Sequence, residues 1–213
     1  MTVILSQAMS AANNMDNDYA RLKELKSSDN ASLKFYEWQK PSLTYGYFTN
    51  PNEFLNKHEF DAARRPTGGG VLFHTLDLAF SFLLPPRYVH ANTYENYKSV
   101  NEVIAKALKE LGLETEFKIT TSPNSKFCMA TPTIYDLMIE GKKCVGAAQR
   151  KTKEGLLHQG TIALRVPGES EKAALKDHSL YNEMIKETYP VQAPVLELKQ
   201  AIERAFLDKY GNS

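Results

Sequence analysis

The run Leu78–Leu84 constrains the fold more than any other stretch of the sequence, because six of its seven residues are apolar and two prolines follow it directly. A strand with one face in water alternates apolar and polar residues, whereas a strand covered on both faces is apolar throughout. Pro85 and Pro86 end the strand, since proline cannot donate to the ladder of a sheet. The run therefore predicts a central strand with packed layers on both of its faces.

Helical periodicity is clearest from about Tyr94 to Leu111, and Gly112 supplies a C-terminal stop. A first helix is expected from Ala8 to Leu25. Beyond about residue 172 the chain reads as a helical tail, with helices expected over Ser179–Glu187 and Pro194–Gly211.

Several β-prone runs fill the rest of the chain, and Leu33–Trp38 and Leu43–Phe48 are expected to form a hairpin through the turn at Pro41. Further strands are expected at Thr115–Ile119, Ile134–Glu140, Lys143–Gln149 and Gly155–Leu164, with Gly141 as a turn residue. Helices and strands do not alternate steadily, which favours an α+β fold of mixed sheets packed with helices over a doubly wound fold. With 213 residues, 42% of them hydrophobic, the chain is long enough for one large domain, or for one domain with a small appendage, and for a sizeable core.

Charge and composition exclude several function classes. Lys and Arg number 26 against 25 Asp and Glu, a net charge of +1, which argues against a protein whose main partner is nucleic acid. We expect a cytoplasmic protein with no membrane partner, because no signal-type N-terminus and no bilayer-length apolar run is present. The cysteines, Cys128 and Cys144, form no CxxC pair and are expected as free thiols, so no metal site is predicted.

Three adjacent glycines, Gly68–Gly70, follow an arginine pair and lead into the β-prone run Val71–Phe73. Consecutive glycines suit a backbone that takes positive φ or that a ligand approaches closely, although a plain flexible turn has the same composition. The position at a strand end favours a shaped loop that carries binding residues. The GxGxxG and GxxxxGK[ST] motifs are both absent, so neither the dinucleotide fingerprint nor a P-loop is available.

Two side chains could carry chemistry. Cys128 follows a polar loop and is a candidate nucleophile, because nearby cations can lower a thiol pKa, whereas Cys144 lies in a strand-like run and fits a buried hydrophobe. Lys143 is either a solvated residue at a basic edge or a donor to a carbonyl oxygen in an acyl pocket. For His74 and His158, structural roles outweigh catalysis when each is considered alone.

In combination these residues resemble a known family. The loop Arg64–Gly70 with His74 resembles the RRxTGGGxVxH motif of the lipoate-protein ligase and octanoyltransferase superfamily, related in fold to the biotin protein ligases, with Leu72 in place of valine. Four other segments resemble family motifs in the same order: Asn14-Met15 with Asp18, Trp38 through Phe48, Lys143 through Gln149, and His158 through Thr161. The resemblance covers the chain to about Lys172 and implies the catalytic-domain fold of that superfamily.

The resemblance also implies roles for individual residues. Phe127-Cys128-Met129 is similar to the ACF segment of the cysteine-dependent octanoyltransferases, departing from it at Phe127 and Met129, which makes Cys128 the nucleophile and Lys143 the carbonyl-facing lysine. The implied substrate-binding residues are Arg65, Thr67, Gly68, Gly69, Gly70, His74, Gly146, His158 and Gly160. The three glycines would shape the wall of an acyl pocket.

The implied activity is transfer of an octanoyl or lipoyl group, through a Cys128 thioester, to a lysine of a lipoyl domain. The donor would be acyl carrier protein or an acylated lipoyl protein. The acceptor would be a lipoyl domain of a 2-oxoacid dehydrogenase or the glycine cleavage H protein, and no cofactor would be required. One alternative is a lipoate-protein ligase that uses ATP and Mg²⁺ and acts through lipoyl-AMP; another is a non-catalytic acyl-binding protein. The sequence leaves open the acyl group, the donor, the acceptor and the oligomeric state.

Overall fold

The structure, a computed structural model, describes residues 2–4, 7–75, 77–117 and 136–211. The strands of these residues form two sheets, one with seven strands in the order β1-β2-β6-β10-β9-β8-β7 and one with three in the order β4-β3-β5. The large sheet consists of β1 (Thr2–Ile4), β2 (Ser32–Phe35), β6 (Asp77–Leu84), β10 (Leu156–Ala163), β9 (Lys142–Lys151), β8 (Leu137–Ile139) and β7 (Glu116–Phe117). The small sheet consists of β4 (Asp61–Arg64), β3 (Ser42–Tyr45) and β5 (Val71–His74).

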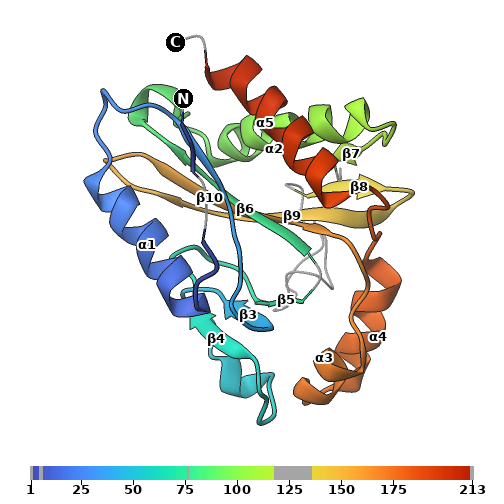
Figure 1. Cartoon of the computed structure of the whole chain (residues 1–213). Coiled ribbons are helices and arrows are strands. Elements are labelled where there is room, and N and C mark those ends of the chain that lie inside the picture. The colour runs from blue at the N-terminus through green and yellow to red at the C-terminus, as the bar shows by residue number, and fades with distance from the viewer. Residues whose placement is uncertain (1, 5–6, 76, 118–135, 212–213) are drawn as a thin grey trace.

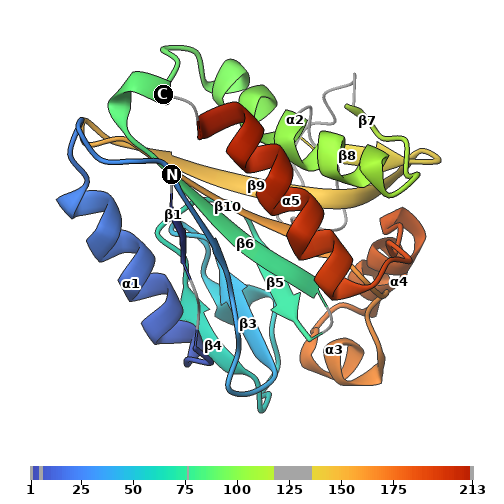
Figure 2. The same cartoon turned by 45° about the horizontal axis from the view of Figure 1, so that its top comes forward.

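The helices cover both faces of the large sheet, as Figures 1 and 2 show. They are α1 (Ala11–Glu24), α2 (Thr93–Glu110), α3 (Glu169–Ala174), α4 (His178–Glu187) and α5 (Val195–Tyr210), with short 3₁₀ turns at Pro51–Glu53 and Pro86–Tyr88. Helices α2 and α5 lie side by side on one face of the large sheet. The small sheet and α1 lie on the other face, and α3 and α4 pack at one end of the molecule. This arrangement confirms the α+β fold of mixed sheets packed with helices.

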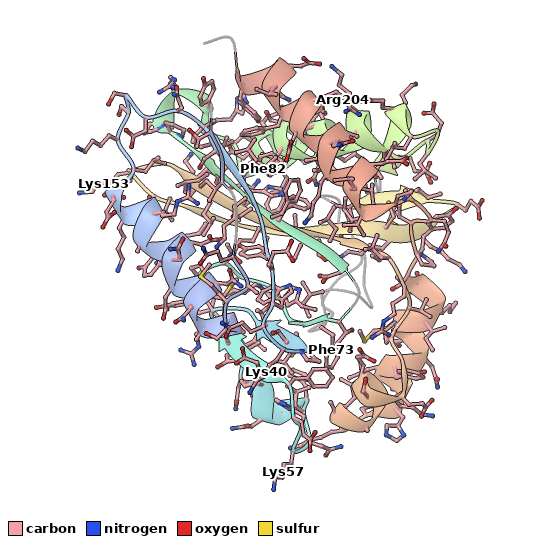
Figure 3. All side chains as sticks on the ribbon, viewed as in Figure 1. Lys40, Lys57, Phe73, Phe82, Lys153 and Arg204 are labelled. Carbon is pink, nitrogen blue, oxygen red and sulfur yellow. The ribbon has the colours of Figure 1, made fainter. Side chains whose placement is uncertain are left out.

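Strand β6 has the central position that its apolar run predicts, since it pairs antiparallel with both β2 and β10. Its side chains alternate between two cores. Phe80 and Phe82 belong to the large core beneath α2 and α5, whereas Ala79 packs with Met15 and Tyr36 on the opposite face. Figure 3 shows Phe82 on the side of α5 and Phe73, from the small sheet, in the lower layer. Both faces of β6 are therefore covered by packed layers.

The expected hairpin of Leu33–Trp38 and Leu43–Phe48 is wrong. Strand β2 pairs with β1 and β6 in the large sheet, while β3 pairs with β4 and β5 in the small sheet. The physical reason is that the two strands bury their apolar side chains in different cores: Leu33 packs beneath α2 and α5, and Leu43 packs with Phe73 beside α3 and α4. The turn at Pro41 thus carries the chain from one layer to the next.

The other expected helices and strands are present within the described residues, and residues 118–119 and 134–135 of two expected strands lie outside them. Helix α2 ends before Gly112, which has φ 80°, and the turn between β8 and β9 contains Gly141, which has φ 72°. Strand β1 and helix α3 were not expected from the sequence, because three and six residues carry too little periodicity to detect. Among the described helices, none combines the length and apolar character that crossing a membrane requires.

Candidate active site

A cleft lies between the small sheet and the facing side of the large sheet. Its lining residues come from α1, from both sheets and from the segments beside them: Met15, Tyr36, Trp38, Thr44, Arg65, Leu72, His74, Ala79, Lys143, Gly146, Ala147, Ala148, Gln159, Gly160 and Thr161. Mostly apolar walls with a few fixed polar groups are typical of a small-molecule site. The cleft suits an apolar chain that carries a polar group at one end.

The glycine loop joins β4 to β5, and of its residues Arg65 lines the cleft, whereas Thr67 and Gly68–Gly70 are not among the lining residues. Arg65 is buried and donates hydrogen bonds to the carbonyl oxygens of Gly68 (3.1 Å) and Gly70 (2.8 Å). Gly69 has φ 90°, a conformation that favours glycine. A Cβ on Gly46 would lie 1.8 Å from the Gly69 carbonyl oxygen, so the β3 end and the loop touch backbone to backbone. Arg65 therefore fixes the shape of the loop.

His74 lines the cleft with both ring nitrogens engaged. Nε2 lies 2.8 Å from Thr44 Oγ1 and Nδ1 lies 2.8 Å from Asp77 Oδ2. The ring stacks on Trp38, with 4.4 Å between centroids. Thr161 donates a further hydrogen bond to the same Asp77 oxygen. These contacts fix the imidazole as one rigid side of the cleft.

Lys143 is buried in the cleft, which excludes the alternative of a solvated lysine at a sheet edge. Its Nζ lies 2.9 Å from Asp136 Oδ2, and both side chains are almost fully buried. A Cβ on Gly146 would lie 2.6 Å from Lys143 Cε and 2.9 Å from Nζ. The lysine side chain thus lies across Gly146 in space that only glycine leaves open. The result is a fixed cation beside an apolar cavity.

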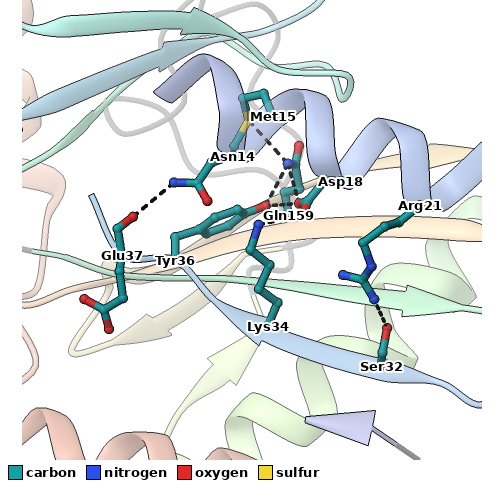
Figure 4. A network of polar contacts seen from close by, with 9 residues as sticks. All are labelled: Asn14, Met15, Asp18, Arg21, Ser32, Lys34, Tyr36, Glu37 and Gln159. Atoms are coloured by element: carbon teal, nitrogen blue, oxygen red, sulfur yellow. Dashed lines mark hydrogen bonds and ion pairs between the residues drawn. The ribbon is translucent and has the colours of Figure 1, made fainter. Parts of the chain in front are cut away.

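Thr67 and Gln159 connect the glycine loop to a buried polar network, drawn in Figure 4 apart from Thr67. Thr67 donates to Gln159 Oε1 (2.8 Å), and Gln159 Nε2 lies within hydrogen-bond distance of Tyr36 Oη (2.8 Å) and Asp18 Oδ2 (3.1 Å). Asp18 also accepts from the Tyr36 hydroxyl and pairs with Lys34 Nζ at 3.3 Å. Burial raises the pKa of Tyr36, with the charge of Asp18 acting in the same direction, so its hydroxyl stays protonated.

His158 does not line the cleft, although the resemblance implies that it binds substrate. It alternates with Gln159 along β10 and faces the core beneath α2, beside the rings of Phe82 and Tyr97. Burial lowers the pKa of His158 to about 3, and Gln149 Nε2 lies 2.7 Å from its Nδ1. The structure therefore places a neutral histidine on the face of the sheet away from the cleft.

Gly160 does line the cleft, and its lack of a side chain leaves room for a neighbouring ring on the opposite face of the sheet. A Cβ there would lie 2.4 Å from the ring of Phe80. The glycine thus lets the Phe80 ring lie flat on β10.

Of the two cysteines, the structure describes only Cys144. Cys144 is fully buried, its S–H donates to the Leu137 carbonyl oxygen at 3.3 Å, and burial raises its pKa to about 12, as expected of a structural thiol. Cys128 lies outside the described residues. Within the described part of the chain, no group of three or more His, Cys, Asp or Glu side chains is arranged to hold a metal ion.

Sequence reasoning missed Asp136, Tyr36 and Gln159 as site residues. Asp136 precedes a short apolar strand and has no sequence neighbour that marks it as the partner of Lys143. Gln159 is adjacent to His158, so the period-two alternation of a strand could have indicated that only one of them faces the cleft.

Comparison with known proteins places these features in a family context. A sequence model of the lipoyl protein ligase A/B catalytic domain matches residues 10–209. The octanoyltransferase LipM of Carboxydothermus hydrogenoformans is 31% identical over 183 residues, covering 81% of this chain and 68% of the relative. The LipM proteins of Halalkalibacterium halodurans and Bacillus subtilis are 30% and 31% identical, covering 63% and 62% of this chain and 55% and 53% of theirs. The chain thus spans about half to two thirds of the length of these curated relatives.

Solved structures share the fold. A lipoate-protein ligase A bound with ATP superposes with a TM-score of 0.77 at 24% identity, covering 97% of this chain and 84% of the other. A bi-partite lipoate protein ligase of Thermoplasma acidophilum has a TM-score of 0.75 at 21% identity, covering 97% and 82%. At these identities the likeness shows a common architecture.

Proposed function

Because the chain belongs to the lipoyl protein ligase A/B catalytic domain family, we propose that it is an octanoyltransferase of protein lipoylation. It moves an octanoyl group from a carrier-protein thioester to a lysine of a lipoyl domain. Relatives about 30% identical that are named octanoyltransferase support this activity. In this proposal residues 1–213 act as one catalytic domain, with a helical tail from about residue 172.

One observation carries the proposal: a buried, carboxylate-paired lysine lies beside an apolar cleft. In an acyl-transfer site the attacked carbonyl oxygen becomes negatively charged, and a preorganised cation stabilises that charge more in the transition state than in the ground state. Lys143 Nζ is such a donor, and Asp136 fixes its position. The apolar lining holds the hydrocarbon chain.

The reaction proceeds in two halves. The Cys128 thiolate attacks the carbonyl carbon of the donor thioester, the carrier's thiol leaves with a proton, and the acyl group becomes a Cys128 thioester. The uncharged amine of the acceptor lysine then attacks that thioester, an amide bond forms, and the proton released by the amine leaves the Cys128 thiol free again. A thioester keeps the acyl group activated, so neither half consumes ATP.

The remaining site residues shape the cleft rather than react. Arg65 and His74 line the cleft, and Thr67 and the glycines Gly68, Gly69 and Gly70 form the loop behind Arg65 that holds it in place. Gly146 leaves room for the lysine, and Gly160 contributes backbone to the lining. His158 contributes to the stability of the sheet from its other face.

An assay of acyl transfer with and without ATP tests this function against its alternatives. The protein is incubated with an unmodified glycine cleavage H protein and either octanoyl-acyl carrier protein alone, or free lipoate with ATP and Mg²⁺. We expect modified H protein in the first mixture. Modification in the second mixture only would identify a lipoate ligase, and a co-purifying fatty acid with no turnover in either mixture would identify an acyl-binding protein.

A further inference from the structure

Phe48 is a large aromatic side chain that is 92% exposed, in the turn that follows β3. The turn is tied to the glycine loop by hydrogen bonds from Gly46 N to Gly70 O (3.2 Å), from Tyr47 N to Thr67 O (2.9 Å) and from Thr49 Oγ1 to Gly69 O (2.8 Å). An exposed aromatic on a fixed turn gains nothing from the core. A single exposed aromatic is common on protein surfaces, so what matters is whether Phe48 belongs to a larger group of side chains that are enriched at interfaces.

Phe48 continues into a row of stacked aromatic and basic side chains. Tyr47 meets Phe48 edge to face with 5.0 Å between centroids, and the Arg150 guanidinium lies 5.1 Å from the Tyr47 ring and 4.7 Å from the Tyr19 ring. At the Tyr19 end of this row, Lys23 Nζ lies 4.0 Å from the centroid of the Tyr19 ring. We call Lys23, Tyr19, Arg150, Tyr47 and Phe48 the aromatic-basic rim.

The rim is joined to the wall of the cleft and carries positive charge. Arg150 donates a hydrogen bond to the Pro66 carbonyl oxygen at 3.0 Å, and Pro66 lies between Arg65 and Thr67. The two charged members of the rim, Arg150 and Lys23, are both cations, so the surface complements an acidic partner. Aromatic residues and arginine are also the side chains enriched at protein interfaces.

We propose that the aromatic-basic rim docks an acidic face of the lipoyl domain that presents the acceptor lysine. This inference rests on the proposed transferase function. A lysine side chain has only a four-carbon stem, so the surface of the acceptor domain has to touch the protein close to the cleft for its amine to reach the acyl group. The rim is a rigid contact surface beside the cleft, because its turn is hydrogen-bonded to the loop that begins with the lining residue Arg65.

The test separates the two halves of the reaction with Phe48→Ser. Acylation of the enzyme by octanoyl-acyl carrier protein is followed by intact mass, and transfer from isolated acyl-enzyme is followed at varied lipoyl-domain concentration. We expect Phe48→Ser to acylate at the wild-type rate and to raise the KM for the lipoyl domain about 10-fold, the loss typical of a central interface aromatic. Lys23→Glu should raise the same KM and reduce its dependence on salt.

Leu196→Ser is the matched control. Leu196 is 66% exposed on α5, which lies on the opposite face of the large sheet from the small sheet and its turn. Leu196→Ser should change neither the acylation of the enzyme nor the transfer to the lipoyl domain. Phe48→Trp, which keeps an aromatic ring, should retain most of the acceptor affinity, and the thermal midpoint of each variant shows whether it folds.

The outcomes distinguish the docking inference from the function on which it rests. If the wild type forms no acyl-enzyme, the transferase function fails and the inference falls with it. If the wild type is acylated but Phe48→Ser transfers with unchanged KM, the docking inference alone is wrong. A slower acylation of Phe48→Ser with unchanged transfer would assign the rim to the donor and would also overturn the inference.

Discussion

Lys143 and Gly146 fit together in one space, since Lys143 Nζ lies 2.9 Å from the position that a Cβ on residue 146 would take. Gly146→Ala is therefore expected to push the ammonium away from its place beside the cleft. Because an oxyanion donor acts only at a fixed position, transfer should slow by about 10²-fold. The rates of both halves of the reaction measure this effect.

Gly68→Ala is the comparison for that substitution. A Cβ on Gly68 meets nothing within 4 Å. Gly68→Ala should slow acyl transfer far less than Gly146→Ala. Equal losses in both variants would show that these two glycines matter for backbone freedom and not for the position of Lys143.

Removing the Lys143 ammonium should slow acyl transfer more than any substitution of its neighbours. Lys143→Ala is expected to slow acyl transfer by about 10²-fold or more, because the charge on the carbonyl oxygen loses its donor. Lys142→Ala, on the exposed side of the same strand, is the control and should keep the wild-type rate. Single-turnover transfer to a lipoyl domain measures the difference, and a near-normal rate in Lys143→Ala would remove this lysine from the mechanism.

The pair of Asp18 and Lys34 should dominate the stability of the polar network, since both side chains are buried. Asp18→Asn leaves the Lys34 cation without its carboxylate and should lower the free energy of unfolding by about 3–5 kcal/mol. The double variant Asp18→Asn with Lys34→Met should recover part of that loss, because no unpaired charge remains buried. Urea unfolding of the wild type, Asp18→Asn, Lys34→Met and the double variant gives the coupling, and additive losses would show that the two residues do not act as a pair.

Acid should destabilise the protein through His158. Its pKa is about 3 in the folded chain, against 6.5 as the ordinary value, so between those pH values the unfolded chain binds one more proton than the folded chain. The free energy of unfolding should therefore fall as pH is lowered through this window, by up to about 1.4 kcal/mol per pH unit.

His158→Gln should flatten that dependence between neutral pH and about pH 5, above the range in which ordinary carboxylates titrate. Urea unfolding at several pH values measures the slope in each protein. An equal slope in wild type and variant would mean that His158 is not the group responsible.

The sequence predicts those parts of the fold in which the local pattern of apolar residues shows which side chains are buried. The apolar run of β6 specifies its central position, and the 3.6-residue spacing of apolar residues specifies α2. The pairing of β2 with β6, and not with β3, depends on which core each strand faces. Local pattern does not contain that information, and for this reason the expected hairpin is wrong.

The site residues also divide into those that a local motif predicts and those that only tertiary packing brings to the site. Motif residues such as Arg65 and His74 come together around the cleft because they flank one loop. Asp136 and Tyr36 reach the site through tertiary packing alone, and His158 leaves it because strand alternation turns it to the other face. The role of Cys128, which lies outside the described residues, is a prediction from family resemblance.

The most direct test of the central claim is the intact mass of the protein after incubation with octanoyl-acyl carrier protein in the absence of ATP. We predict one octanoyl adduct that hydroxylamine removes, that is absent in Cys128→Ser, and that forms far more slowly in Lys143→Ala than in Lys142→Ala. An adduct that persists in Cys128→Ser, or that appears only with ATP and free acid, would contradict the account.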